Sequence, residues 1–245
     1  MYDPAQFTLS NMIDCASALR GLGKGAQSME EAAGRIVRYL HDILVDQETG
    51  AKACALVRFY KTHAYGELDP ELRAFAGGLL GGQPEMPAMK CLVLLATAGH
   101  KPEWNSRAHS AGHKAIPLPS EQVIAQIPMI SQLIQQFGVE VRTVLEPDPA
   151  LIMELEQKTY NVFHVPEALG SPYVPAQEGF VVPFGIKSVL GFGGMLPSGD
   201  LFAIILFAQV TIPRETGELF KTLALSAKMA VLPFVGKAIF ASKPI

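Results

Sequence analysis

The feature that most constrains the fold of this chain is a pair of apolar runs separated by turn residues. The runs are Ser188–Met195 and Leu201–Ile212. Proline, serine, glycine and aspartate at positions 197–200 lie between them, and these residue types favour tight turns for different steric and hydrogen-bonding reasons. The sequence therefore predicts a β-hairpin, preceded by a strand over Phe180–Ile186 and followed by a helix that Pro213 opens.

The rest of the chain predicts two more long strands, set among helices. The first is Cys54–Tyr60, and the second is Cys91–Ala98, whose almost continuous apolar run is typical of a strand covered on both faces. Strands that occur in runs, with helices before, between and after them, favour an α+β sandwich with an antiparallel sheet. The other expected elements are helices over Ser10–Leu22, from the cap Ser28 through Leu44, over Pro70–Ala76, after Ser120 with a break at Pro128, and over Leu151–Val162, a short strand over Phe137–Val144, and a loop over Phe163–Glu178.

Composition limits the classes of partner. Hydrophobic residues make up 49% of the 245 residues and charged residues 18%, which is apolar enough for a sizeable core. The net charge is -3 and no block of five basic residues occurs, so we expect no nucleic-acid partner. The longest apolar run, Leu201–Ile212, is shorter than the roughly 20 residues of a membrane-spanning helix, and Met1–Ser10 lacks the pattern of a secretion signal.

The cysteines indicate the compartment. Cys15, Cys54 and Cys91 are far apart, are odd in number and form no CxxC pair. This spacing argues against a disulfide framework and against a thiolate zinc site, and predicts small buried side chains. We therefore expect a cytoplasmic protein without a membrane anchor.

The segment from Ser188 through Phe207, with the helix after Pro213, resembles the end of a GAF domain. The stretches Gly112–Ser120 and Tyr160–Gln177 are similar to N-terminal sensor regions of bacterial histidine kinases and related phosphatases. The resemblance implies a central antiparallel sheet with helices on one face and a loop-roofed pocket on the other, used in signal transduction such as two-component systems. It implies one sensor domain over 1–245, with N-terminal helices in 1–50, sheet and pocket loops in 51–212, and a C-terminal helix in 213–245 that leads to an output domain.

Two family signatures are absent. The chain has no Cys-His dipeptide, so covalent attachment of a bilin is not expected, and it lacks the Asn-Lys-Phe-Asp-Glu signature of cyclic-nucleotide-binding GAF domains. The resemblance therefore implies a sensor without naming its ligand.

The first group of candidate binding residues lies in the polar segment after the second strand: Trp104, Asn105, His109 and His113. On a helix the two histidines, four residues apart, would share a face and could hold a metal. The alternatives are a solvated loop with incidental histidines and a polar lid over a ligand pocket, since binding residues concentrate on loops.

The second group of candidates is Tyr160, Phe163, His164 and Tyr173, on a loop stiffened by prolines. Rings and one imidazole can line an apolar pocket, and His164 could serve as an axial haem ligand. The alternative is that the aromatic residues plug the edge of the sheet and His164 is a satisfied, partly buried side chain. The glycines of Gly191–Gly194 lie within a strand, which indicates a bulge or a close approach rather than a phosphate loop.

Catalytic patterns are weak. Ser110 lies near His109 and His113, but the chain has no GxSxG elbow and no acid placed by sequence to orient a base. Glu154 and Glu156 indicate a solvated helix face. The sequence therefore predicts a protein that is not an enzyme.

The leading hypothesis is a cytoplasmic sensor domain whose small-molecule ligand enters between the sheet and the loops Gly99–Ser120 and Phe163–Gln177. Binding would bias the helix after Pro213 and so a downstream output domain. Apolar stripes on the terminal helices predict a homodimer. The alternatives are a dimerisation or protein-interaction module without a ligand, and a sensor that carries haem or a metal; no cofactor is identified.

Overall fold

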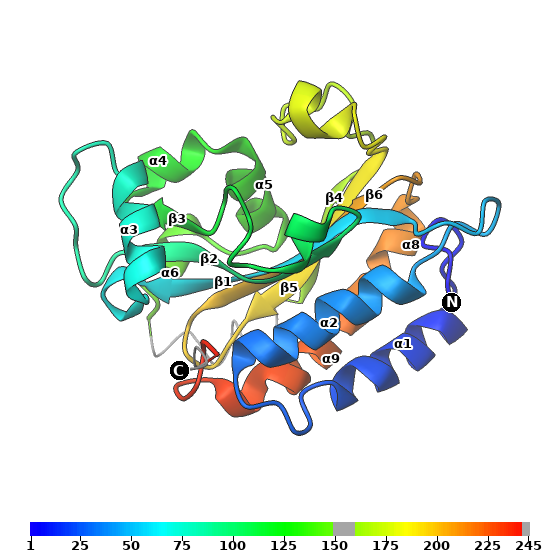
Figure 1. Cartoon of the computed structure of the whole chain (residues 1–245), viewed down its shortest axis with the longest axis horizontal. Coiled ribbons are helices and arrows are strands. Elements are labelled where there is room, and N and C mark those ends of the chain that lie inside the picture. Colours follow the sequence, from blue (N-terminus) through cyan, green and yellow to red (C-terminus); the bar gives the residue numbers. More distant parts are fainter. Residues whose placement is uncertain (149–159, 242–245) are drawn as a thin grey trace.

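A computed structural model gives the arrangement of residues 1–148 and 160–241 (Figure 1). Six strands form one antiparallel sheet in the order β3-β2-β1-β6-β5-β4. The predicted α+β class and antiparallel sheet are thereby confirmed. The strands are β1 (Cys54–Ala64), β2 (Lys90–Gly99), β3 (Ala115–Leu118), β4 (Asn161–Val165), β5 (Ser188–Met195) and β6 (Leu201–Ala208).

Helices begin where capping residues satisfy their first backbone donors. The predicted caps Ser28, Asp69 and Ser120 all accept a hydrogen bond from the backbone N–H three residues later. The α-helices are α1 (Leu9–Gly21), α2 (Met29–Ile43), α3 (Pro70–Leu79), α4 (Glu121–Ala125), α5 (Pro128–Gln136), α6 (Val141–Leu145), α8 (Arg214–Glu218) and α9 (Phe220–Val231), with 3-10 turns at Tyr65–Glu67, Pro102–Asn105 and Leu232–Phe234 and a π-helical turn at Gln177–Val181.

The predicted hairpin lies inside the sheet, and its strand β6 is one of the two central strands. Its strands β5 and β6 pair from Ser188 opposite Ala208 to Met195 opposite Leu201, and Gly199 takes a left-handed φ of 75° in the connecting turn. On its other side β6 pairs with β1. Every residue of β5 and β6 is buried, as expected of strands covered on both faces.

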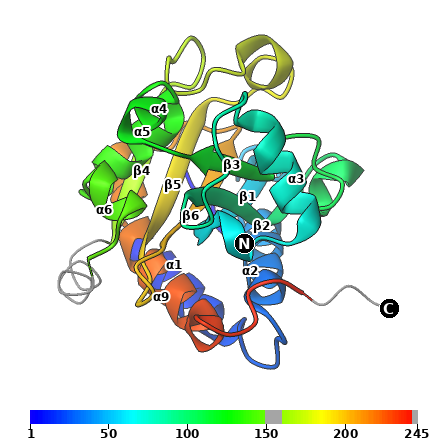
Figure 2. The same ribbon diagram turned by 90° about the vertical axis from the view of Figure 1, so that its left-hand side faces the viewer.

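The two faces of the sheet carry separate hydrophobic clusters (Figures 1 and 2). Helices α2 and α9 cover one face, where Phe59, Phe192 and Phe202 point, and α1 packs against α9. The other face, which we call the loop face, receives α4, α5 and the segment 174–186, and its cluster includes Phe163 and Ile205. This is the architecture that the GAF resemblance implies, with the addition of short helices over the loop face.

Two predicted strands are wrong. Phe137–Val144 contains the C-cap of α5, a left-handed Gly138 that follows it, and most of α6. Phe180–Ile186 contains part of the π-helical turn and further turns, with Gly185 at a φ of 59°. Apolar side chains alone favoured a strand in each case, but both segments cover the loop face and pair with no strand.

The boundary around β4 also differs from expectation. The predicted helix over Leu151–Val162 lies mostly outside the described residues, but its last two positions belong to β4. The predicted loop after Phe163 begins inside the same strand.

β3 was not expected at all, because its four residues give too short a pattern. The run Leu201–Ile212 is a strand only as far as Ala208, and no helix in the described ranges is long and apolar enough to cross a bilayer.

The glycines of β5 mark close approaches, as predicted. A Cβ on Gly193 would overlap the backbone oxygen of Phe202 and would lie 2.9 Å from the ring of Phe137. A Cβ on Gly191 would lie 2.8 Å from the Cδ1 atom of Ile205 and 3.3 Å from Phe163. Both glycines therefore let aromatic rings pack directly onto the backbone of the sheet.

We expect Gly193→Ala to lower the free energy of unfolding by about 1 to 3 kcal/mol, because the added methyl overpacks a rigid region. Urea denaturation measures the change. The control is Gly21→Ala at the end of α1, where a Cβ meets no atom within 4 Å. Alanine favours a helix more than glycine does, so this control should be neutral or slightly stabilising, and equal losses in the two variants would contradict the packing argument.

Candidate functional site

A cavity of about 560 Å³ lies on the loop face of the sheet, between the strands, helices α5 and α6, and the segments 104–113 and 174–180. Small-molecule sites in proteins have volumes of this order and are mostly apolar. The cavity therefore lies where the sequence predicts a pocket, between the sheet and the two loops.

The floor of the cavity comes from alternate residues of neighbouring strands, because successive side chains of a strand point to opposite faces. β1 contributes Leu56, Arg58, Tyr60 and Thr62. The apolar remainder of the floor and walls includes Leu92, Ile116, Leu118, Ile127, Met129, Ile130, Leu133, Ile134, Val144, Val174, Leu201, Ala203, Ile205 and Phe207.

Arg58 places a positive charge at the floor of the cavity. Its guanidinium donates to the Tyr60 hydroxyl at 3.0 Å and to the Ser110 hydroxyl at 3.4 Å. Ser110 in turn donates to the backbone oxygen of Gly112 at 3.0 Å. Arg58 therefore fastens the polar segment after β2 to the floor of the cavity.

His113 lies at the edge of the cavity in a strained backbone conformation. Its φ is 60°, in the left-handed region that residues other than glycine seldom adopt. The residue as a whole is exposed, but partial desolvation of its ring and the nearby Arg58 guanidinium lower the pKa of His113 below its usual value. The imidazole is therefore neutral at neutral pH and offers one donor and one acceptor at the cavity.

Aromatic rings close one end of the cavity. Trp104 lies with its ring centroid 4.6 Å from that of Phe184 and 5.6 Å from that of Phe180, and Phe180 meets Phe207 of the floor edge to face. These contacts join the segment after β2 to the segment before β5. Lys101 lies over Trp104, 5.5 Å from the ring centroid.

Of the first predicted group, Trp104 and His113 line the cavity. Asn105 does not line it; its amide bonds the backbone of Gly99 and Lys101 and so fixes the turn after β2. His109 is exposed in a turn, and no helix places it beside His113. The helical metal-binding arrangement considered for this pair is therefore wrong.

The second predicted group does not gather at the cavity. Phe163 is buried against Gly191, His164 bonds the backbone oxygen of Ile212 through Nε2 at 2.9 Å, and Tyr173 is exposed. Tyr160 packs toward the helix-covered face, with Lys228 over its ring. This arrangement arises because Asn161–Val165 is an edge strand whose side chains are divided between the two faces.

The residues that sequence analysis missed are Arg58 and Tyr60. The available signal was a polar or hydroxyl-bearing side chain at alternate positions of an otherwise apolar strand. The neighbour relationship with Ser110 could not be read from the sequence, because it depends on how the segment after β2 folds back.

A second, polar cavity of about 670 Å³ lies on the helix-covered face, at one end of β1, β2 and β6. The Asp200 carboxylate accepts hydrogen bonds from Lys61 at 2.7 Å, Lys90 at 2.8 Å and Ser198 at 2.7 Å. Burial raises the pKa of Asp200, but the two ammonium groups outweigh this effect and hold it below its usual value. This ionised cluster ties the ends of three strands together.

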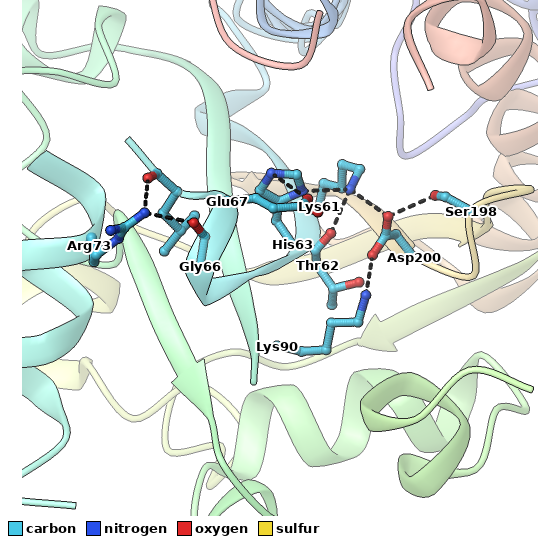
Figure 3. Close-up of polar contacts among 10 residues, drawn as sticks. Lys61, Thr62, His63, Gly66, Glu67, Arg73, Lys90, Ser198 and Asp200 are labelled. Carbon is cyan, nitrogen blue, oxygen red and sulfur yellow. Dashed lines mark hydrogen bonds and ion pairs between the residues drawn. The ribbon is translucent and has the colours of Figure 1, made fainter. Parts of the chain in front are cut away.

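Lys61 is saturated within this cluster. Only 1% of the residue is exposed, and its ammonium also donates to the backbone oxygen of Thr62 at 2.7 Å and faces Nδ1 of His63 at 3.3 Å (Figure 3). Burial and Lys61 lower the pKa of His63 to about 4, so its ring is neutral and accepts this third proton. We therefore interpret the cluster as structural, because its charged groups bind one another and hold the strand ends together.

The C-terminal segment covers the second cavity. The carbonyl oxygens of Ala238 and Ile239 accept from the first two backbone N–H groups of α2, at 2.9 Å each. The Phe240 ring lies edge to face on His63, and the guanidinium carbon of Arg107 lies 5.4 Å from the centroid of the Phe240 ring. Residues 236–240 are thereby attached to the start of α2 and to the polar segment after β2.

Metal binding finds no support in the described ranges, where no group of three or more His, Cys, Asp or Glu side chains could hold an ion.

Cys15, Cys54 and Cys91 are free and buried, as predicted, and burial raises the pKa of each thiol to about 12. His164, considered above as a haem ligand, is not among the residues of either cavity.

No family model and no curated protein matches this chain. Among solved structures, the free methionine-R-sulfoxide reductase of Neisseria meningitidis is 11% identical over 94% of each chain, with a TM-score of 0.49. A GAF domain of a phosphoenolpyruvate-protein phosphotransferase from Coxiella burnetii is 14% identical over 93% of this chain and 97% of its own, with a TM-score of 0.41. A bacteriophytochrome from R. palustris is 10% identical over 94% of this chain, which spans only 39% of that protein, with a TM-score of 0.42. At these identities the similarity does not extend to a ligand or a reaction.

We expect Asp200→Asn to lower the free energy of unfolding by about 3 to 5 kcal/mol, because it leaves the buried Lys61 ammonium without its counter-charge. Chemical denaturation measures the loss. Asp42→Asn is the matched control: Asp42 pairs with Lys52 at 2.6 Å, but its side chain is 66% exposed. The control should cost less than about 1 kcal/mol, and similar losses in both variants would refute the structural role of the cluster.

Proposed function

We propose that residues 1–245 form one sensor domain that binds a small, largely apolar molecule in the loop-face cavity and passes the effect to its C-terminal segment. The observation that carries the proposal is the cavity itself. It is apolar on most sides, has the volume of a ligand site, and collects a few polar groups at one place: Arg58, Tyr60 and His113.

The polar segment after β2 offers a route from the cavity to the C-terminus. Within it, Ser110 bonds Arg58 at the cavity, and three residues earlier Arg107 forms a two-pronged pair with Glu30 at 3.1 and 3.0 Å. Glu30 also accepts from the backbone N–H of Ala241 at 3.0 Å, and Arg107 lies over Phe240. A ligand that favours one position of this segment would thereby favour one attachment of the C-terminal residues.

This route differs from the one that the sequence suggested, through the helix after Pro213. Helices α8 and α9 follow β6, but α9 packs on the helix-covered face, and the sheet separates it from the cavity. The segment after β2, in contrast, contacts the cavity and the C-terminal residues directly. We therefore propose that the segment 104–114 relays the effect of the ligand to the C-terminal residues. An output partner would be the molecule or domain that contacts those C-terminal residues.

The proposal includes a homodimer through the terminal helices. Leu9 and Ile13 of α1 are 61% and 57% exposed, and Leu225 and Met229 of the adjoining α9 are 39% and 49% exposed. Exposed apolar residues at helical spacing on two adjoining helices form a surface that a second copy can cover by two-fold pairing.

Binding can be tested with the neutral dye N-phenyl-1-naphthylamine, whose fluorescence rises in apolar surroundings. We expect saturable binding of one dye per chain, and a loss of at least about tenfold in affinity for Ala203→Met, because the longer side chain fills space above the floor. Ala51→Met, in an exposed turn, is the matched control and should bind as the wild type does. Unsaturable binding, or equal affinities in the two variants, would place the dye outside the cavity and reject the proposal.

The dimer is tested by light scattering at micromolar concentration. Met229→Glu should convert the dimer to a monomer, because a charge would be buried between the copies without a partner. Leu169→Glu changes an apolar residue that is 61% exposed and lies outside α1 and α9, and this control should leave the dimer intact. A monomeric wild-type protein would show that the terminal helices do not pair.

A further inference from the structure

Arg58 is the one residue with a permanent charge among the described residues that line the loop-face cavity. It stands on the floor between Leu56 and Tyr60, and apolar side chains of α5 and β6 face the same space. A charge in apolar surroundings is costly unless an opposite charge compensates it. The question is therefore what compensates Arg58.

The protein itself supplies only neutral partners. Two of the five guanidinium donors reach the hydroxyls of Tyr60 and Ser110, and the buried Nε has no acceptor. Within the described residues no carboxylate lies within ion-pair distance of Arg58, although its neighbours are close enough to order the side chain.

Three other enclosed cations of this chain have carboxylate partners. Lys61 and Lys90 share the Asp200 carboxylate, and Arg107, whose side chain is 15% exposed, pairs with Glu30 and Asp69. The fold thus pairs these structural cations with carboxylates. Arg58, which lines the cavity, has no carboxylate partner among the described residues.

We propose that the ligand is a small organic acid: an apolar body that fills the cavity, with one anionic group that binds Arg58. This inference rests on the proposed ligand-binding function and adds the chemical class. The planar guanidinium matches the two oxygens of a carboxylate or sulfonate, and before a ligand binds the Tyr60 and Ser110 hydroxyls hold the guanidinium in place. His113, neutral at the cavity edge, adds a hydrogen-bonding group without a competing charge.

Two dyes separate the body of such a ligand from its charge. The dye 8-anilinonaphthalene-1-sulfonate carries the same rings as N-phenyl-1-naphthylamine and adds one sulfonate. We expect the wild type to bind the sulfonate dye at least about tenfold more tightly, and this preference to fall as salt is added, because screening weakens the contact between opposite charges.

Arg58→Gln should abolish the preference by weakening the sulfonate dye at least about tenfold more than the neutral dye. Saturable binding of the neutral dye also shows that the variant is folded. Arg142→Gln removes a charge from α6 whose side chain is 78% exposed, and should keep the wild-type preference. Ala203→Met should weaken both dyes.

The outcomes distinguish the two proposals. If the wild type binds both dyes equally, or if Arg58→Gln weakens them equally, the cavity binds apolar molecules but the organic-acid inference is overturned. If neither dye binds saturably, the proposed ligand-binding function itself fails. The comparison of dyes on the wild type decides between these results even if Arg58→Gln does not fold.

Discussion

The pairing of β6 with β1 on one side and β5 on the other is the constraint on which the rest of the structure depends. All eight residues of β6 are buried, so each alternate residue must find an apolar partner on its own face. Phe202 and Ile204 belong to the cluster under the helices, and Ala203 and Ile205 belong to the loop face. A shift of one residue in this register would exchange the two sets and destroy both clusters.

The same alternation divides the polar residues of β1 between two sites with opposite electrostatic character. Lys61 and His63 turn to the helix-covered face, where Asp200 neutralises the cluster and closes the ends of the strands. Arg58 and Tyr60 turn to the loop face, where the described residues provide no counter-charge. One strand therefore carries a neutralised ionic cluster on one side and a cation without a counter-charge on the other. Only the cation without a counter-charge favours the binding of a charged ligand.

Much of the fold could be predicted from sequence because the central strands and capped helices carry strong local patterns. The hairpin of β5 and β6 has apolar runs with turn residues between them, and Ser28, Asp69 and Ser120 mark helix starts. Phe180–Ile186 has a similar apolar pattern but no partner, because β4 and β6 already flank β5. The site was harder to predict. Trp104 and His113 could be selected because they lie on a polar loop. Arg58 could not, because it lies within a strand, and its neighbours depend on the strand register and on how the segment with Ser110 folds back over the sheet.

Under the sensor proposal, Ser110 would connect ligand binding in the cavity to the C-terminal residues. Its 3.4 Å contact is the longer of the two that hold the Arg58 guanidinium, so an anion in the cavity would compete first with this bond. Loss of the bond would free the segment around Ser110, and Arg107 three residues before it would then hold Glu30 and Phe240 less firmly. Under the organic-acid proposal, the energy of a charge-assisted hydrogen bond in the cavity would therefore be transmitted to the C-terminal residues by one short segment, without any movement of the sheet.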